Sequence, residues 1–246
     1  MKLSAFDLKA MALVAMVAEH SARYVPEWLP PGWPVILFGL GRIVIPIFFF
    51  LSIESLHKTR DRARYLRRLW LWGGAMALGN LALPWGLGQL RAGAPAINQN
   101  ILLSIALGVS GVAAWEWANA QEHPERTGAW LLPLACAVGL LATEAGMLGL
   151  LLYGVFGFFR RHDAWRWRGF VAVCALYLAW ALTLPASEFW STGYQWLMVL
   201  ALPLLKAYDG NPGRVRLQAL FYVAYPVHVW ILYGVAVLLL GHGRVV

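Results

Sequence analysis

The chain has 246 residues, of which 60% are hydrophobic and 13% charged, and it carries a formal net charge of +8. A soluble domain of this size cannot cover so much apolar surface. The composition therefore excludes a soluble globular protein and predicts an integral membrane protein. The basic residues are not interleaved with aromatic residues on one surface, and we expect no nucleic acid partner.

The apolar residues form runs of roughly 15 to 24 residues separated by short polar breaks, and a run of about 20 crosses a bilayer as one helix. We predict an all-α fold, a polytopic bundle of about nine transmembrane helices in a single domain over residues 1–246. The fifth and sixth runs are short and separated only by TEAG, so a tight hairpin or one broken helix is also compatible with them. In chain order, the expected spans are 5–25, 33–56, 66–86, 97–118, 129–143, 146–160, 169–186, 192–206 and 217–240.

Basic residues gather in alternate loops, at 57–68, 123–128, 160–168 and 206–216. Lys and Arg mark the loops that stay in the cytoplasm. The pattern therefore places the N-terminus in the cytoplasm and, with nine crossings, the C-terminus on the opposite side. Anionic phospholipid is an expected partner of these basic loops.

The sequence contains no P-loop, HExxH, CxxC or GxSxG motif, and its loops are too short for a separate soluble domain. The two cysteines, Cys136 and Cys174, lie in apolar runs without metal-ligand spacing, so we expect no metal site. Chemistry is therefore expected from polar side chains inside the helices, where an unpaired polar group costs a few kcal/mol.

Glu19 and His20 lie side by side in the outer half of the first predicted helix. Imidazole titrates near neutral pH, so His20 is a candidate general base or proton carrier, and a hydrogen-bonded structural histidine is the alternative. Glu19 points about 100° away on a helix, so the two need not be partners. Arg42 follows GLG, where small residues allow close approach, and could neutralise Glu19 or Glu144. Glu188 falls in an outer loop.

A second polar group is expected toward the cytoplasmic side. Arg60, Arg64 and Arg68 are spaced i, i+4 and i+8, which on a helix gives one face suited to phosphate groups. The alternative for this segment is an anchor that contacts anionic lipid.

The segment FYVAYPVHVWILYG, residues 221–234, carries Tyr222, Tyr225 and His228 along one apolar helix. Pro226 has no N–H, so it predicts a freed carbonyl and a bend. Aromatic core packing also explains the tyrosines, but explains Pro226 with His228 less well. We place Tyr225 and His228 toward the cytoplasmic side, away from His20.

Four segments carry a family resemblance: FDLKAMALVAMVAEH, GRIVIPIFFFLSIESLHKTRDRARYLRRL, YDGNPG and FYVAYPVHVWIL. In their order and spacing, over nearly the whole chain, they resemble the TraX family of bacterial membrane proteins, which includes the TrbP proteins of conjugation systems. The family usually shows Asp-His where this chain has Glu19 and His20, and Asn-Gly where it has Asp209 and Gly210.

The resemblance implies a multi-pass protein of the bacterial inner membrane, with its C-terminus in the periplasm. The founding member is linked to N-terminal acetylation of conjugative pilin, and the family is similar to membrane acyltransferases that use an acyl-CoA donor. The expected activity is transfer of an acetyl group from acetyl-CoA, as cosubstrate, to the N-terminal amine of a pilin-like subunit. No tightly bound cofactor is expected.

In such enzymes a membrane-embedded histidine is the expected base, a role that would fall to His20. Glu19 or Glu144 would orient the imidazole or bind the substrate ammonium, and Arg42 would stabilise charge or hold the acid. Acceptor contacts are expected from Glu144, Glu188 and Tyr222. Coenzyme A is expected to contact cations through its phosphates and other polar side chains through its pantetheine arm: Lys58, Arg60, Arg64, Arg68, His57, Tyr225 and His228.

Other functions remain compatible with the sequence. A proton-coupled transporter would also bury Glu, His and Arg, although no internal repeat is visible. A noncatalytic pilin assembly factor would tolerate alanine at His20. Another pilin modification, including cyclisation, would not need the basic face, and the acceptor could also be a small molecule or polysaccharide.

Overall fold

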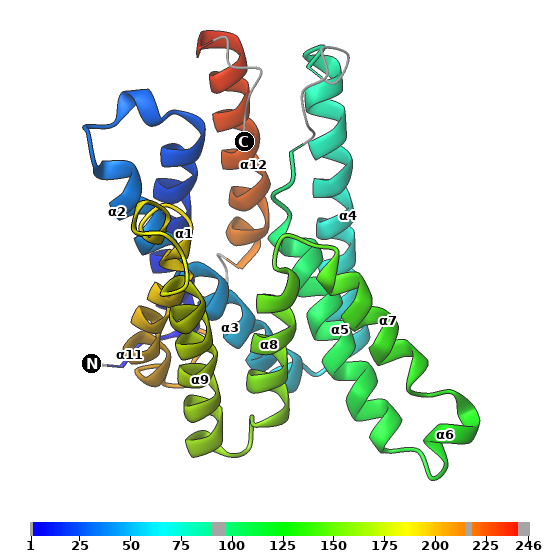
Figure 1. Ribbon diagram of the computed structural model, residues 1–246. Helices are drawn as coiled ribbons and strands as arrows, with labels where there is room; N and C mark the ends of the chain where they lie inside the picture. The colour runs from blue at the N-terminus through cyan, green and yellow to red at the C-terminus, as the bar shows by residue number, and fades with distance from the viewer. Residues whose placement is uncertain (1, 90–96, 215–217, 241–246) are drawn as a thin grey trace. The chain divides into compact units, whose positions relative to one another are not determined.

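The computed structural model describes residues 2–89, 97–214 and 218–240 (Figure 1). Within these residues all regular elements are helical, and the extended backbone forms one isolated bridge, between Leu3 and Tyr208. The predicted all-α class is therefore confirmed. The helices are α1 (Ala5–Tyr24), η1 (Pro26–Trp28), α2 (Trp33–Gly41), α3 (Val44–Lys58), α4 (Arg62–Gly86), α5 (Ile101–Asn119), α6 (Pro124–Thr127), α7 (Leu131–Leu141), α8 (Gly146–Phe158), α9 (Asp163–Ala181), α10 (Ala186–Phe189), η2 (Gly193–Leu200), α11 (Ala201–Lys206) and α12 (Gln218–Leu240).

The chain divides into two compact units, with boundaries inside α3, α4 and α9 and in the segment before α5. The single domain predicted over residues 1–246 stays a prediction. Unit 1 contains Met1–Ile47, Leu78–Asn98 and Val171–Val246, and unit 2 contains Phe48–Ala77 and Gln99–Phe170.

Each predicted span contains helix within the described residues, but two of the spans are divided. The second span becomes α2 and α3, with a break at Arg42 and Ile43, and the eighth becomes η2 and α11. The short fifth and sixth runs form α7 and α8, two separate helices that pack against each other. Among the described residues three segments are long and apolar enough to cross a membrane: Trp33–Lys58, Ile101–Asn119 and Leu220–Leu238.

The nine crossings and their orientation stay predictions that fusion reporters can test. A reporter active only in the cytoplasm should be active when inserted in 57–68 or 160–168, because these loops are rich in Lys and Arg. The same reporter fused after Val246 should be silent. Activity at Val246 would mean an even number of crossings, and residues 129–160 would then be the first segment to re-examine.

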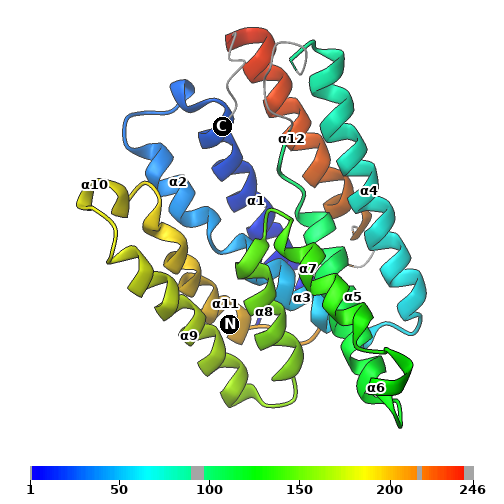
Figure 2. The ribbon, with the colours of Figure 1, turned by 45° about the vertical axis from the view of Figure 1, so that its right-hand side comes forward.

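In unit 1, α1 packs against α2 and α12 (Figure 2). The loop after α11 holds the start of α1: Leu3 N–H donates to the Ala207 carbonyl at 2.8 Å, and Asp209 N–H donates to the Leu3 carbonyl at 2.9 Å. Gly213 has a φ of +71°, and a Cβ there would lie 2.5 Å from the Ser4 hydroxyl. The YDGNPG segment is therefore a turn fitted to the α1 N-terminus.

Asp209 stabilises this turn through two hydrogen bonds from Asn211. The backbone N–H of Asn211 donates to Asp209 Oδ1 at 2.8 Å, and its side-chain amide donates to Oδ2 at 2.9 Å. These donors favour the carboxylate and lower the pKa of Asp209 below its usual value.

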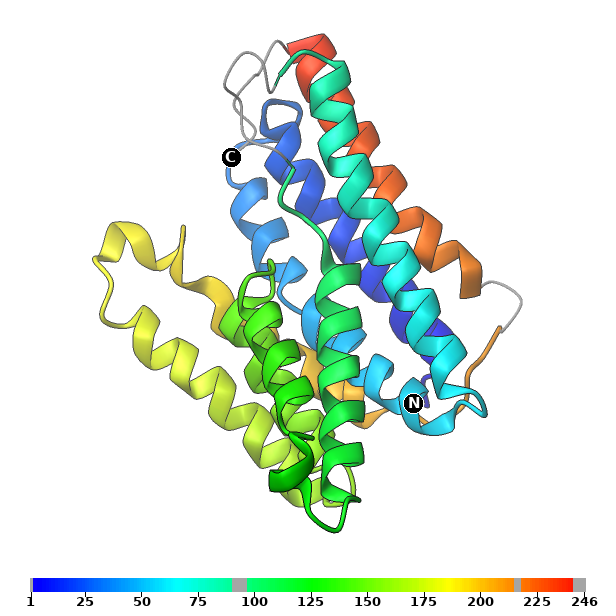
Figure 3. The same cartoon turned by 90° about the vertical axis from the view of Figure 1, so that its right-hand side faces the viewer.

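In unit 2, α5, α7 and α8 lie side by side (Figure 3). Gly108 on α5 allows the Tyr153 ring to pack against the helix, since a Cβ at Gly108 would lie 2.0 Å from that ring. The Tyr153 hydroxyl is 3.0 Å from the Ser52 hydroxyl, and Tyr65 donates to the Ser52 carbonyl at 3.2 Å. These contacts join α3 and α4 to the three-helix group.

Candidate functional site

His20 on α1 and His228 on α12 form a hydrogen-bonded pair in unit 1. His20 Nδ1 lies 2.8 Å from His228 Nε2, and the ring planes are inclined by 18°. His20 is 7% exposed. The pair corrects the expectation that His228 and Tyr225 lie away from His20, at a different depth. The position of a residue along its own predicted helix did not show which residue of a neighbouring helix lies beside it.

The backbone determines which nitrogen of each ring carries the proton. His228 Nδ1 lies 2.8 Å from the Ala224 carbonyl, which can only accept, so this nitrogen carries a hydrogen. In the neutral ring Nε2 is then an acceptor, and His20 Nδ1 must be the donor. The neutral His20 ring therefore has its lone pair on Nε2, which has no hydrogen-bond partner among the described residues. In this arrangement His20 Nε2 is able to accept a proton.

Aromatic rings from the same two helices surround the pair. The Tyr225 ring centroid lies 6.2 Å from that of His20 and 5.5 Å from that of His228, and Tyr24 lies 6.4 Å from His20. Tyr24, Tyr225 and Tyr233 are all buried. This apolar surrounding limits the access of water to the imidazoles and strengthens local electrostatic interactions.

Glu19 does not contact the His20 ring, as the 100° separation predicts. Its carboxylate pairs with Arg42 Nη2 and lies 3.6 Å from Arg23 Nη2. The orienting contact expected of Glu19 or Glu144 is therefore made by His228. Of the two interpretations of Arg42, neutralisation of Glu19 is the one that the geometry supports.

Arg42 is held at the break between α2 and α3 by all parts of its guanidinium group. Nε donates to the Phe38 carbonyl at 3.0 Å, Nη1 donates to Gln195 Oε1 at 3.0 Å, and the group lies 5.2 Å from the Tyr194 ring centroid. Gly41 leaves room for the acid, since a Cβ there would lie 2.2 Å from Glu19 Oε2. The close approach expected at GLG is therefore made by the side chain of Glu19.

The prediction that Arg60, Arg64 and Arg68 share one helical face is wrong for Arg60. Arg60 precedes α4, which begins at Arg62, because Asp61 caps that helix by accepting from the Arg64 N–H at 2.8 Å. Arg64 and Arg68 do lie one turn apart on α4, and both are exposed. Arg64 also pairs with Asp61 at 3.3 Å.

His57 differs from His20 because both of its ring nitrogens face acceptors. Nδ1 lies 2.8 Å from the Ile53 carbonyl and Nε2 lies 2.6 Å from Glu116 Oε1. Arg62 donates to the other Glu116 oxygen at 2.9 Å. No ring nitrogen of His57 is left to accept a substrate proton, so this cluster links α3, α4 and α5 and does not form a base.

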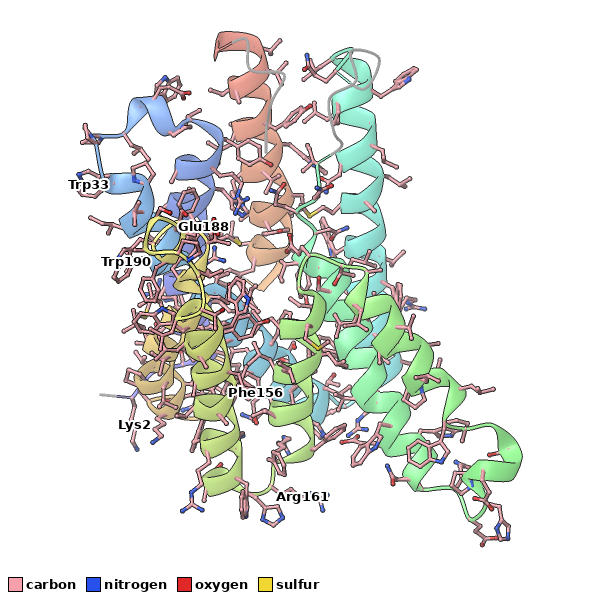
Figure 4. The ribbon with its side chains drawn as sticks, in the orientation of Figure 1. Lys2, Trp33, Phe156, Arg161, Glu188 and Trp190 are labelled. Atoms are coloured by element: carbon pink, nitrogen blue, oxygen red, sulfur yellow. The ribbon has the colours of Figure 1, made fainter. Side chains whose placement is uncertain are left out.

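The residues expected to contact the acceptor occupy separate elements. Glu144, between α7 and α8, accepts from the Asn100 N–H at 2.9 Å. Glu188 is exposed on α10, where Figure 4 shows it close to Trp190. Tyr222 is half-buried on α12, one turn before Tyr225. Their roles stay predictions.

Several residues that contact the candidate residues or the neighbouring Glu54 were not predicted from the sequence: Arg23, Tyr194, Gln195, Glu116, Arg160 and Arg166. Two of them had a usable signal. Arg23 follows Glu19 by four residues, a spacing that brings side chains together on a helix. Arg166 stands between Trp165 and Trp167, and its guanidinium carbon lies 4.6 Å from the Trp167 ring centroid. Gln195 gave no signal, because no local pattern predicts its contact with Arg42.

A family model matches most of the chain, and a known protein matches a shorter stretch of it. The chain is similar over 72 residues, at 36% identity, to the Probable fimbrial assembly protein FimC, serogroup H1, of Dichelobacter nodosus, and this stretch covers 28% of each protein. No solved structure matches. A family model described as TraX protein matches residues 4–236, a range that includes both histidines of the pair and the buried Glu19–Arg42 pair. The chain therefore belongs to the TraX family.

Proposed function

We propose that the chain is an acyltransferase of the bacterial inner membrane that moves an acetyl group from acetyl-CoA to the N-terminal amine of a pilin-like subunit. The observation that carries this proposal is the hydrogen bond between His20 and His228, which leaves a buried imidazole with its lone pair available. Membership of the TraX family, and a relative named for fimbrial assembly, support a pilin-like acceptor.

The chemistry needs a base for the amine and a means to stabilise the oxyanion. The neutral amine attacks the thioester carbonyl carbon while His20 Nε2 takes the proton that the nitrogen loses. The intermediate collapses with cleavage of the C–S bond, and the coenzyme A thiolate leaves and takes a proton from His20. His228 Nε2 accepts from His20 throughout and stabilises the imidazolium. Arg42 and Arg23, which both pair with Glu19 on the helix that carries His20, are the proposed source of positive charge for the oxyanion.

The proposal is tested by supplying both substrates to the purified chain in nanodiscs. Acetyl-CoA and a peptide with the N-terminal sequence of a pilin from the same host should yield free thiol and an acetylated peptide, detected by mass spectrometry. A peptide with a blocked N-terminus is the control. If pili from cells with and without the chain have the same mass, and the peptide is unmodified, the proposal fails.

A noncatalytic pilin assembly factor is the second candidate, and the fimbrial-assembly relative favours it. Such a factor would bind pilin without releasing thiol from acetyl-CoA. It would also assemble pili normally with alanine at His20, so assembly and acetylation would separate in that variant.

His228 provides a test of how the base is positioned. His228→Ala should lower kcat by about 10- to 100-fold, the typical loss when a ligand histidine in a metal site loses its orienting partner. KM for acetyl-CoA should stay unchanged. His228→Gln should recover part of the rate, because the amide oxygen can accept from His20 Nδ1. Equal losses in the two variants would indicate that His228 is itself the base.

A further inference from the structure

Glu54 on α3 gathers three cations in unit 2. Its carboxylate lies 3.6 Å from Lys58 Nζ, 3.5 Å from Arg160 Nε and 3.3 Å from Arg166 Nη1. A well-made bond between a cationic N–H and a carboxylate measures about 2.7–2.9 Å. All three contacts are longer, so Glu54 is shared among three cations and binds none of them at the optimal distance.

Both arginines of this cluster have a buried Nε–H group that makes no hydrogen bond in the described part of the chain, since the 3.5 Å contact of Arg160 with Glu54 is an ion pair only. Arg166 is only 9% exposed, and its guanidinium group is held beside the rings of Phe50 and Trp167. Buried N–H groups without an acceptor cost free energy, and such groups in a native protein call for an explanation.

The cluster lies partly at the surface of unit 2. Arg166 also pairs with Asp163, whose side chain is 74% exposed. The Lys58 and Arg160 side chains are 43% and 28% exposed, so the cluster reaches the surface. An anion from outside can therefore meet these cations.

We propose that Lys58, Arg160 and Arg166 bind a phosphate group, and that Glu54 holds these cations together when the phosphate is absent. Guanidinium groups present several N–H donors in a plane, which suits phosphate oxygens. The phosphate belongs either to coenzyme A or to an anionic lipid headgroup. If the phosphate belongs to coenzyme A, the inference rests on the proposed function. The coenzyme A phosphates would then bind at the Glu54 cluster, and not at Arg60, Arg64 and Arg68.

Glu54→Gln separates this inference from a purely structural role of the cluster. Glutamine keeps the size of the side chain but removes a negative charge that repels phosphate. Affinity for the anion should therefore rise, by at least about 3-fold. Arg160→Ala and Lys58→Ala should each weaken binding by about 10- to 100-fold, the loss expected for charge-assisted contacts. Arg161→Ala, in the same turn after α8 (Figure 4), is the matched control and should bind normally.

Binding is measured without acceptor, so failure of acyl transfer does not affect the result. The full chain in phosphatidylcholine nanodiscs is titrated with coenzyme A, and native mass spectrometry measures retention of phosphatidylglycerol by the detergent-purified chain. If coenzyme A binds more tightly to Glu54→Gln and more weakly to Arg160→Ala, the phosphate belongs to the donor. If only the binding of phosphatidylglycerol changes in this way, the phosphate belongs to the lipid.

Thermal unfolding of every variant shows whether it is folded before binding is compared. If folded Glu54→Gln binds both ligands no more tightly than the unmodified chain, the inference is overturned. It is overturned equally if Arg160→Ala and Arg161→Ala bind alike.

Discussion

His20→Ala is expected to give a folded protein that still binds acetyl-CoA but has lost acyl transfer by about 10²- to 10⁴-fold. This range is the usual contribution of a positioned base to the rate. Of the four ring nitrogens of the two histidines, His20 Nε2 is the one with an available lone pair. His228 uses Nδ1 for the Ala224 carbonyl and Nε2 for His20. Single-turnover rates with saturating acetyl-CoA measure the loss directly.

His20→Gln separates catalysis from structure at this position. The glutamine amide can donate to His228 Nε2, so the helix contact and the stability should be largely retained at a cost of about 1 kcal/mol. The amide has no basic nitrogen, so transfer should stay as low as in His20→Ala. His123→Gln, an exposed histidine in the loop after α5, is the control for substitution alone. Near-native turnover in His20→Gln would show that the catalytic base is not on α1.

The sequence predicted helices well, because apolar composition over about 20 residues decides whether a segment forms a membrane helix. It predicted the break at Arg42 poorly, since the residues around it are apolar on both sides. The break depends on contacts from distant segments, with Glu19 on α1 and Gln195 on η2. Such contacts leave no local periodicity.

In the candidate site, too, features of a single helix were predictable and contacts between distant segments were not. Residue type alone identified His20 and Glu19 as unusual inside a helix, and helix geometry separated their directions. The partners could not be inferred, because the contact between His20 and His228 joins residues 208 positions apart. Arg160 and Arg166 were assigned only to topology, since the sequence does not show that their side chains turn toward a buried Glu54.

Removal of Arg42 is expected to cause the largest loss of stability in unit 1. Arg42→Ala leaves Glu19, which is 7% exposed, with Arg23 at 3.6 Å as its remaining cation. Removal of one partner of a buried ion pair typically costs about 3 to 5 kcal/mol, and the remaining contact with Arg23 places the expected loss at the lower end of this range. Adding Glu19→Gln to Arg42→Ala should recover much of this loss, because the buried charge is then gone. Additive losses in the double variant would mean that the two side chains do not stabilise each other.

Gly41→Ala tests the same ion pair without changing any charge. A Cβ at Gly41 would lie 2.2 Å from Glu19 Oε2 and 2.6 Å from its carboxyl carbon, so the acid must move away from Arg42. Gly74→Ala on α4 is the matched control, because a Cβ there meets nothing within 4 Å and alanine favours a helix by roughly 0.5–1 kcal/mol over glycine. Thermal unfolding should therefore show a lower Tm for Gly41→Ala and an equal or higher Tm for Gly74→Ala. Equal Tm values for both variants and the unmodified chain would show that Glu19 can leave Arg42 without cost, and that this ion pair does not stabilise the helix that carries His20.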